Sequence, residues 1–230
     1  MNSFKINSYA KINLALNIIS RTHSLHKIES IVSFLDLHDV ILIKKIKNKN
    51  HKIKFVGKFS HNIKSKNTVS QLLKNIDKKN LLKDKLQILI KKNIPTEAGL
   101  GGGSMNAANI LNFLIKKRLI KIKKKEIIEM SNSIGSDVIL GIYSKNLILR
   151  SNDLIKTIPI KKKIYTLIVK PNFGCSTKKI YSKVKKFSKP KFNIASKHMF
   201  NIKFLKKMKN DLESIALNEY PKLDILKKFL

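Results

Sequence analysis

The sequence has 230 residues and a mass of 26.4 kDa, which is enough for one large domain or two modest ones with a hydrophobic core. Apolar residues make up 43% of it, which excludes a wholly disordered chain. The formal net charge of +35 suggests either a polyanionic partner or a compositional bias. All but three of the 49 basic residues are lysine. Proteins that bind nucleic acid contact bases and phosphates mostly through arginine, whose planar guanidinium group can make two hydrogen bonds at once. Isoleucine and asparagine are also abundant, and all three residue types have A/T-rich codons, so we favour the bias over a genuine polyanion surface.

The cysteine content and the N-terminus bear on the compartment. The single cysteine, Cys175, excludes a disulfide within the chain and fits a reducing environment. No apolar run approaches the roughly 18 residues of a transmembrane helix. The N-terminal residues alternate like a strand and lack the apolar segment of a signal peptide. We therefore expect a soluble, cytoplasmic protein in which Cys175 is a filler residue rather than a catalytic thiol.

Strand patterns dominate the first part of the chain. Residues 9–19 alternate apolar and polar side chains, which predicts a half-buried strand. Residues 40–46 and 52–59 alternate apolar residues with lysine, a pattern of two antiparallel strands with one wet face. Apolar residues at helical spacing predict a helix at 67–79, and a strand pattern returns at 86–90.

Helices become frequent in the second half of the chain. A helix is expected at 104–119, and a shorter one at 126–134 that ends with Gly135 in the C-cap position. These patterns predict an α+β fold with antiparallel strands and helices collected on one side, divided into domains 1–155 and 156–230. The elements expected beyond residue 160 are a strand at 164–169 and helices at 178–186, 200–217 and 223–230, with a linker-like segment at 188–196.

The strongest local signal is the glycine cluster Gly99–Gly103, between a strand and an amphipathic helix, which holds four of the eight glycines. Without β-carbons its N–H groups can converge on one anion, and the helix start adds unpaired N–H groups and a positive dipole end. Ser104 can donate to a phosphate oxygen or lie close to Mg²⁺. The alternative is a flexible turn with an ordinary serine N-cap. A Walker loop is excluded because the Gly-Lys-Ser/Thr ending is absent.

A phosphoryl-transfer site also needs positive charge near the phosphates and a group that orients or deprotonates the attacking hydroxyl. Asp137 follows a helix stop at the head of an apolar run, where it can expose a carboxylate at the edge of a cleft. The alternative for Asp137 is an N-cap or turn residue. Lys11 lies in an apolar strand and forms a short polar strip with Asn13, which by spacing alone is the wet face of an edge strand.

Three further polar residues have weaker signals. His26 can hydrogen-bond a base or a ribose, although an isolated histidine is more often a surface residue. Asp36 and Asp39 are expected to be ordinary turn residues between strands. None of these residues selects a substrate by itself.

Several blocks of sequence, in chain order, resemble the family of 4-diphosphocytidyl-2-C-methyl-D-erythritol kinases, within the superfamily of galactose, homoserine, mevalonate and phosphomevalonate kinases. The triple glycine distinguishes the loop from the serine-rich loop of superfamily relatives. The resemblance implies a two-lobed small-molecule kinase fold with antiparallel and mixed sheets, an N-terminal lobe at 1–155 that carries the phosphate loop, and a partial C-terminal lobe at 156–230. The matching blocks are residues 10–14, 26–39, 99–108, 134–138, 210–213 and 220–221.

The resemblance implies ATP-dependent phosphorylation of the 2-hydroxyl of 4-diphosphocytidyl-2-C-methyl-D-erythritol in the non-mevalonate isoprenoid pathway, with ATP and Mg²⁺ as cofactors. Asp137 would accept the hydroxyl proton, and Lys11 would hold Asp137 ionised and stabilise the developing charge. Asn67 would lie near the adenine, and Asn13 and His26 would face the cytidine. The ATP phosphates would be wrapped by Pro95, Thr96, Glu97, Ala98, Gly99, Leu100, Gly101, Gly102, Gly103, Ser104 and Met105.

The sequence departs from the family at three places. Leu25 stands where the family has a tyrosine that stacks on cytosine. We therefore expect either a weaker nucleotide affinity or another aromatic ring in its place, such as Phe173 or Tyr181. Ile139 replaces a proline. The family's third glycine-rich motif is not reached before Leu230, so we expect a shortened C-terminal lobe or a fragment.

As partners we expect the nucleotide-linked polyol substrate alone, without nucleic acid or membrane, in a monomer or homodimer. Three alternatives stay open: a superfamily kinase for another small alcohol, a basic nucleic-acid-binding protein, and a non-catalytic remnant.

Overall fold

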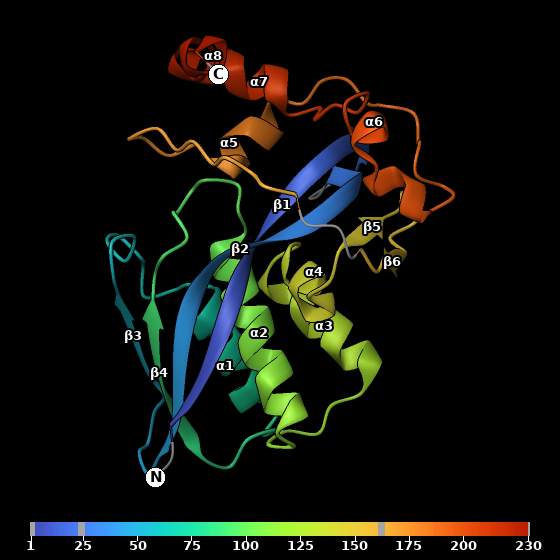
Figure 1. The fold of residues 1–230 in the computed structure, drawn as a ribbon. Helices are drawn as coiled ribbons and strands as arrows, with labels where there is room; N and C mark the ends of the chain where they lie inside the picture. The colour runs from blue at the N-terminus through green and yellow to red at the C-terminus, as the bar shows by residue number, and fades with distance from the viewer. Residues whose placement is uncertain (1–2, 23–25, 161–163, 230) are drawn as a thin grey trace. The chain divides into compact units, whose positions relative to one another are not determined.

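The computed structural model describes residues 3–22, 26–160 and 164–229 (Figure 1). The chain forms two compact units that are discontinuous in sequence. The first consists of Met1–Lys11, Leu35–Thr96 and Leu100–Ser144, and the second of Ile12–Phe34, Glu97–Gly99 and Lys145–Leu230. The long strands β1 (Phe4–Arg21) and β2 (His26–Ile46) pair with each other and contribute to both units in turn. The division at residue 155 stays a prediction.

In the first unit, β4 (Lys85–Lys91) lies between β2 and β3 (Lys52–Val56). β2 pairs antiparallel with β4, with Val40 opposite Lys91, whereas β3 runs parallel to β4. The strands expected at 40–46 and 86–90 are confirmed, the strand expected at 52–59 ends at Val56, and the α+β class with a mixed sheet is confirmed too. The arrangement predicted for 40–46 and 52–59 as an antiparallel pair is wrong, because β4 occupies the place between them.

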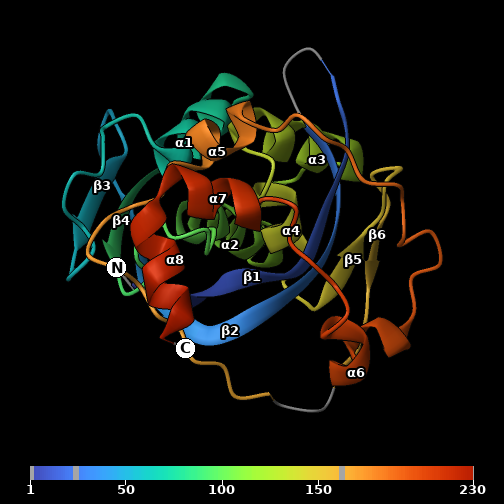
Figure 2. The same ribbon diagram turned by 90° about the horizontal axis from the view of Figure 1, so that it is seen from above.

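The helices of the first unit gather on one side of its strands (Figure 2). α1 forms as predicted because Asn67 caps it and its apolar residues recur at helical spacing. The side chains of Val69, Leu72, Leu73 and Ile76 are buried against β2, β4 and α2, and they form the core of this unit. The helices are α1 (Thr68–Lys78), α2 (Gly102–Lys116), α3 (Lys124–Ile134) and α4 (Val138–Tyr143).

The second unit has a small antiparallel sheet and short helices. Ser30–Val32 of β2 pairs with β5 (Leu147–Leu149), which pairs with β6 (Ile155–Thr157). Across the described ranges, no helix combines the length and the apolar character that crossing a bilayer requires. The helices of this unit are α5 (Thr177–Ser182), the 3₁₀ helix η1 (Lys197–Phe200), α6 (Ile202–Leu205), α7 (Glu213–Glu219) and α8 (Pro221–Lys228).

Two expectations for the second unit are wrong. Residues 164–169 form no strand, and Tyr165 and Leu167 are exposed, because a β-branched run becomes a strand only where a neighbour satisfies its N–H and C=O groups. The single helix expected at 200–217 is broken at residues 206–212. There the chain bonds to β1 instead: the Leu16 N–H donates to the Lys209 carbonyl (3.1 Å), and the Ile18 N–H donates to the side-chain Oδ2 of Asp211 (2.7 Å).

The linker-like segment 188–196 is irregular but firmly attached. The Phe192 side chain is fully buried. The amides of Lys191 and Phe192 donate to the buried carboxylate of Glu29 at 2.6 and 3.1 Å, and Asn17 Nδ2 donates to the same group at 2.7 Å. Glu29 therefore anchors this segment to the strands of its unit.

Candidate active site

Lys11 and Asp137 meet in the first unit. Lys11 Nζ lies 3.2 Å from Asp137 Oδ2, and the two side chains are 7% and 32% exposed. The Lys11 N–H donates to the Leu100 carbonyl at 3.0 Å, so the segment entering the glycine cluster covers this part of β1. The prediction from spacing alone, that Lys11 lies on the solvent-exposed face of an edge strand, is therefore wrong. The pair joins a buried ammonium group to a carboxylate that a solute can reach.

Asp137 occupies the N-cap position of α4 but does not cap it. Its side chain makes no hydrogen bond to an α4 amide. The carboxylate binds the Lys11 ammonium instead. Of the roles weighed for Asp137, the capping role is wrong, whereas the turn position is confirmed, and the partly exposed carboxylate at the edge of α4 agrees with the functional role.

Gly101 brings the loop against this pair. Its φ of +66° is in the left-handed region that favours glycine. A β-carbon at Gly101 would lie 2.9 Å from Lys11 Cγ and 3.6 Å from Asp137 Oδ2. Only a residue without a side chain lets the backbone pass this close to the two charged groups.

α2 begins inside the glycine cluster, at Gly102 rather than at Ser104. Its first helical hydrogen bond runs from the Met105 N–H to the Gly101 carbonyl (2.9 Å). The amides of Gly102, Gly103 and Ser104 precede this bond and have no acceptor within the helix. The N-cap residue is Gly101, without a side-chain cap, so the serine N-cap alternative is wrong. These amides and the helix dipole can attract an anion at a point beside the Lys11–Asp137 pair.

The start of α1 is tied to this loop. Thr68 Oγ1 donates to the Gly103 carbonyl at 2.6 Å. Asn67 Oδ1 accepts the amides of Val69 and Ser70, both at 3.0 Å, and Asn67 Nδ2 donates to backbone carbonyls. The Asn67 side chain is thus engaged in capping, and its contact with adenine stays a prediction.

The other residues predicted to wrap phosphates differ in exposure. Leu100 and Met105 are buried, and their backbones bond to Lys11 and Gly101, whereas Thr96 and Gly99 are exposed. Pro95 and Ala98 are half-buried.

Glu97 belongs to the second unit by its contacts. Its carbonyl accepts the Cys175 N–H at 3.0 Å. Burial raises the pKa of the Cys175 thiol, which agrees with a filler role.

A second cluster lies in the other unit and contains His26. The rings of His26 and Tyr181 are 5.3 Å apart at 47°. His26 Nε2 is buried and has no hydrogen-bond partner within the described ranges. Burial, with a smaller contribution from the positive charge of Arg21, lowers the pKa of His26. Asn13 Nδ2 donates to Ser30 Oγ at 2.7 Å, which holds its amide in place.

Comparison with known proteins assigns the chain to a family. The model of the N-terminal domain of GHMP kinases matches residues 67–145. The 4-diphosphocytidyl-2-C-methyl-D-erythritol kinase of Pelagibacter ubique (strain HTCC1062) is 57% identical over 231 residues, covering all of this chain and 82% of the relative. The enzyme of the same name from Clostridium tetani (strain Massachusetts / E88) is 35% identical, covering 98% of this chain and 83% of the relative. The chain belongs to the 4-diphosphocytidyl-2-C-methyl-D-erythritol kinase family.

A solved structure supports the fold. The crystal structure of a 4-(cytidine 5'-diphospho)-2C-methyl-D-erythritol kinase has a TM-score of 0.67 at 18% identity, over 97% of this chain and 81% of that chain. The kinase fold expected from the sequence motifs is confirmed. Within this family, the Lys11–Asp137 pair and the glycine cluster are the candidate catalytic centre.

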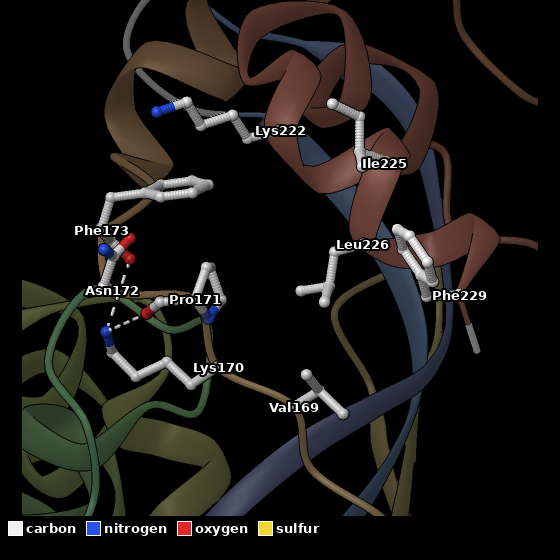
Figure 3. Close-up of a pocket in the computed structure, with 9 residues that line it drawn as sticks. All are labelled: Val169, Lys170, Pro171, Asn172, Phe173, Lys222, Ile225, Leu226 and Phe229. Carbon is white, nitrogen blue, oxygen red and sulfur yellow. Dashed lines mark hydrogen bonds between the residues drawn. The ribbon is translucent and has the colours of Figure 1, made fainter.

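The family's stacking tyrosine would fall at Leu25, which lies outside the described residues. Of the two aromatic residues proposed to replace it, Tyr181 lies beside His26, whereas Phe173 stacks on Tyr220 at 6.0 Å. Figure 3 shows Phe173 in a groove together with Leu226 and Phe229, where Lys170 Nζ donates to the Pro171 carbonyl. Apart from Phe173, none of the predicted site residues is among the described residues that line this groove.

Two residues near the candidate centre of this kinase-family chain escaped the sequence reasoning. Asp39 is fully buried inside β2 and pairs with the buried Lys92, so the expected turn role is wrong. The alternation of buried and exposed side chains along β2 and β4 could have predicted that both residues are buried. Asp39 shares parity with the buried Ile41, and Lys92 with the buried Ile90, so each faces the core.

Proposed function

We propose that the protein transfers the γ-phosphoryl group of ATP to the 2-hydroxyl of 4-diphosphocytidyl-2-C-methyl-D-erythritol, in the cytoplasm. The observation that carries the proposal is the Lys11–Asp137 pair, 3.2 Å apart, next to the glycine-lined start of α2. The choice of acceptor follows the names of relatives at 57% and 35% identity.

Asp137 is proposed as the base. Its carboxylate takes the proton of the acceptor hydroxyl while the oxygen forms a bond to the γ-phosphorus, and the bond to the β-phosphate oxygen breaks to release ADP. Lys11 orients the Asp137 carboxylate through the ion pair and stabilises negative charge that develops at the transferred group. The burial of Lys11 strengthens both effects, because water screens a buried charge less.

The start of α2 is proposed as the phosphate site. The amides of Gly102, Gly103 and Ser104 have no helical acceptor and can donate to phosphate oxygens. A high positive charge over the chain attracts two polyphosphate ligands.

Mg²⁺ bound with ATP would neutralise phosphate charge. Throughout the described ranges, no three His, Cys, Asp or Glu side chains come together as a metal cluster. Protein-bound Mg²⁺ commonly keeps water and phosphate ligands and takes only one or two protein oxygens. The Ser104 hydroxyl at the start of α2 is one such oxygen, so we propose that Mg²⁺ arrives with the nucleotide and takes few ligands from the protein.

His26 and Tyr181 are proposed to recognise the cytosine. The His26 Nε2 atom is buried and unpartnered within the described structure, which suits a hydrogen bond to a base edge. The Tyr181 ring beside it offers an aromatic face for stacking. Asn13, held by Ser30, is proposed to bind the same end of the substrate.

The deciding experiment is an acceptor panel. Purified protein with ATP and Mg²⁺ should release ADP with 4-diphosphocytidyl-2-C-methyl-D-erythritol and not with homoserine, mevalonate or galactose. Equal ADP release without acceptor, or turnover of another alcohol in its place, would contradict the proposal. The nucleic-acid alternative predicts a steeply salt-dependent affinity for DNA or RNA, which the same preparation can be tested for.

A further inference from the structure

A buried ion pair lies beneath the glycine loop of the first unit. Lys92 Nζ contacts Asp39 Oδ2, and the two side chains are 4% and 0% exposed. Removing two charges from water is costly, and an apolar pair of similar size would often be as stable. A role in stability alone therefore does not account for the pair.

The Asp39 carboxylate connects the two ends of the loop. Its Oδ1 accepts the amides of Asn93 and Ile94, both at 2.8 Å, where the chain leaves β4 toward Pro95. Its Oδ2 accepts Asn106 Nδ2 at 3.0 Å, where the chain has already entered α2. One carboxylate thus holds the segment before the loop and the helix after it.

Asn106 and Lys92 are both arranged around this carboxylate. Asn106 Oδ1 is buried and has no hydrogen-bond partner within the described ranges, so the amide is oriented by its bond to Asp39 alone. Lys92 Nζ lies 3.2 Å from the position of a β-carbon at Gly102, the first residue of α2. The pair therefore lies directly against the amides that would face a phosphate.

We infer that Asp39, with Lys92 as its counterion, is a positioning residue that fixes both ends of the loop at residues 95–105. By holding Ile94 and Asn106 it keeps the amides of Gly102, Gly103 and Ser104 aimed at one point. The inference about ATP rests on the proposed function. The inference about the geometry of the loop does not.

We call the hydrogen bonds from Asp39 to the two ends of the loop the clamp. Asn106→Leu provides the sharpest test because it removes the bond between Asp39 and α2 and leaves the ion pair with Lys92 intact. It also removes the unpartnered Oδ1, so the melting temperature should stay near that of the wild type. Amide hydrogen exchange over residues 99–105 should become at least about tenfold faster. The KM for ATP should rise by about tenfold while the KM for the acceptor stays constant.

Asn109→Leu is the matched control on the same helix. Its Nδ2 donates to the Met105 carbonyl at 2.9 Å and does not contact Asp39. It should leave loop exchange and the KM for ATP unchanged. If Asn106→Leu and Asn109→Leu give the same exchange rates over 99–105, the clamp is wrong, whatever the enzyme assays show.

The double variant Asp39→Asn/Lys92→Met separates position from charge. It removes both charges, keeps an oxygen for the two loop amides, and lets the Asn106 amide turn so that its Oδ1 accepts the new N–H. The expected result is a folded protein with a KM for ATP within about threefold of the wild type. A folded double variant that loses ATP affinity more than tenfold, but not adenosine affinity, would mean that the Lys92 charge acts on the phosphates and would overturn the inference.

The two proposals can fail separately. If the wild-type protein releases no ADP with any acceptor, the proposed function is rejected, while the amide exchange rates over residues 99–105 still test whether Asp39 positions the loop.

Discussion

Gly101 and Lys11 approach so closely that a β-carbon on Gly101 would lie 2.9 Å from Lys11 Cγ and 3.0 Å from Lys11 Cε. The backbone of the loop therefore packs directly on the buried stem of the lysine. The same lysine places its ammonium group on Asp137. Lys11 lies 88 positions before the glycine cluster and Asp137 lies 34 positions after it, and the three thus form one local structure.

Gly101→Ala should damage both the fold and the reaction. The alanine would face a left-handed φ of +66° and a clash with the Lys11 stem, so we expect a loss of about 1–2 kcal/mol in the free energy of unfolding and a kcat at least about tenfold lower. Gly99→Ala is the control, because its φ is +71° but no atom lies within 4 Å of its β-carbon position. Equal losses of kcat in both variants would show that the approach to Lys11 is unimportant.

Asp137→Asn should abolish base catalysis and preserve nucleotide binding. We expect kcat to fall by about 10²–10⁴-fold, with the dissociation constant of ATP little changed, because the amide is isosteric but cannot accept the proton as a carboxylate does. Calorimetric titration with ATP and an ADP-release assay measure the two quantities. Asp84→Asn, at an exposed ion pair with Lys45, should leave both unchanged. A variant as fast as the wild type would exclude Asp137 as the base.

Thr68→Val should loosen the contact between α1 and the glycine loop. The variant loses the 2.6 Å hydrogen bond to the Gly103 carbonyl, and we expect about 1 kcal/mol less stability together with a severalfold higher KM for ATP. Thr68→Ser keeps the hydroxyl and should behave like the wild type. A KM for ATP that is the same in both variants would mean that this bond does not shape the phosphate site.

Acceptor binding should depend on pH below 6.5. Burial and Arg21 lower the pKa of His26 below the usual 6.5, so its imidazole is neutral at pH 7 and takes up a proton only in more acidic solution. The KM for the acceptor should therefore be flat above pH 6.5 and rise as the pH falls through the lowered pKa. The free energy of unfolding should also decrease as the pH falls from 6.5 through this lowered pKa. The reason is that His26 of the unfolded chain, with its usual pKa of 6.5, binds a proton at a higher pH than His26 of the folded chain. His26→Gln should abolish the rise in KM, and a persistent rise would assign it to another group.

Glu29→Leu should detach the segment at 188–196. The substitution leaves the buried amides of Lys191 and Phe192 without their acceptor, at a cost of about 2–4 kcal/mol in the free energy of unfolding. Glu29→Gln keeps an oxygen for these amides and should lose less. Thermal melts and hydrogen exchange at residues 191–192 test this, and unchanged exchange in Glu29→Leu would refute the anchoring role.

Local patterns predicted the elements whose stability depends on close neighbours. The spacing of Val69, Leu72 and Ile76 predicted α1 and its buried face, because these residues share a face in any helix. The helix stop at Gly135 and the glycine cluster before α2 were predicted in the same way. The strand expected at 164–169 failed because a strand also needs a partner, which no local pattern supplies.

By itself, the sequence determined the family, the glycine loop and the identities of Lys11 and Asp137 as candidates. It left each of these two residues with an alternative: the solvent-exposed face of an edge strand for Lys11, and an N-cap or turn residue for Asp137. Only the tertiary structure decided between the readings, since it covers Lys11 with the backbone at Leu100 and Gly101 and leaves the Asp137 side chain out of the cap. It also turned Asp39 from an expected turn residue into a buried carboxylate bound to Lys92 and Asn106. The physical reason is that an ion pair or a hydrogen bond between distant residues depends on where the folded chain brings them, which periodicity along the sequence does not encode.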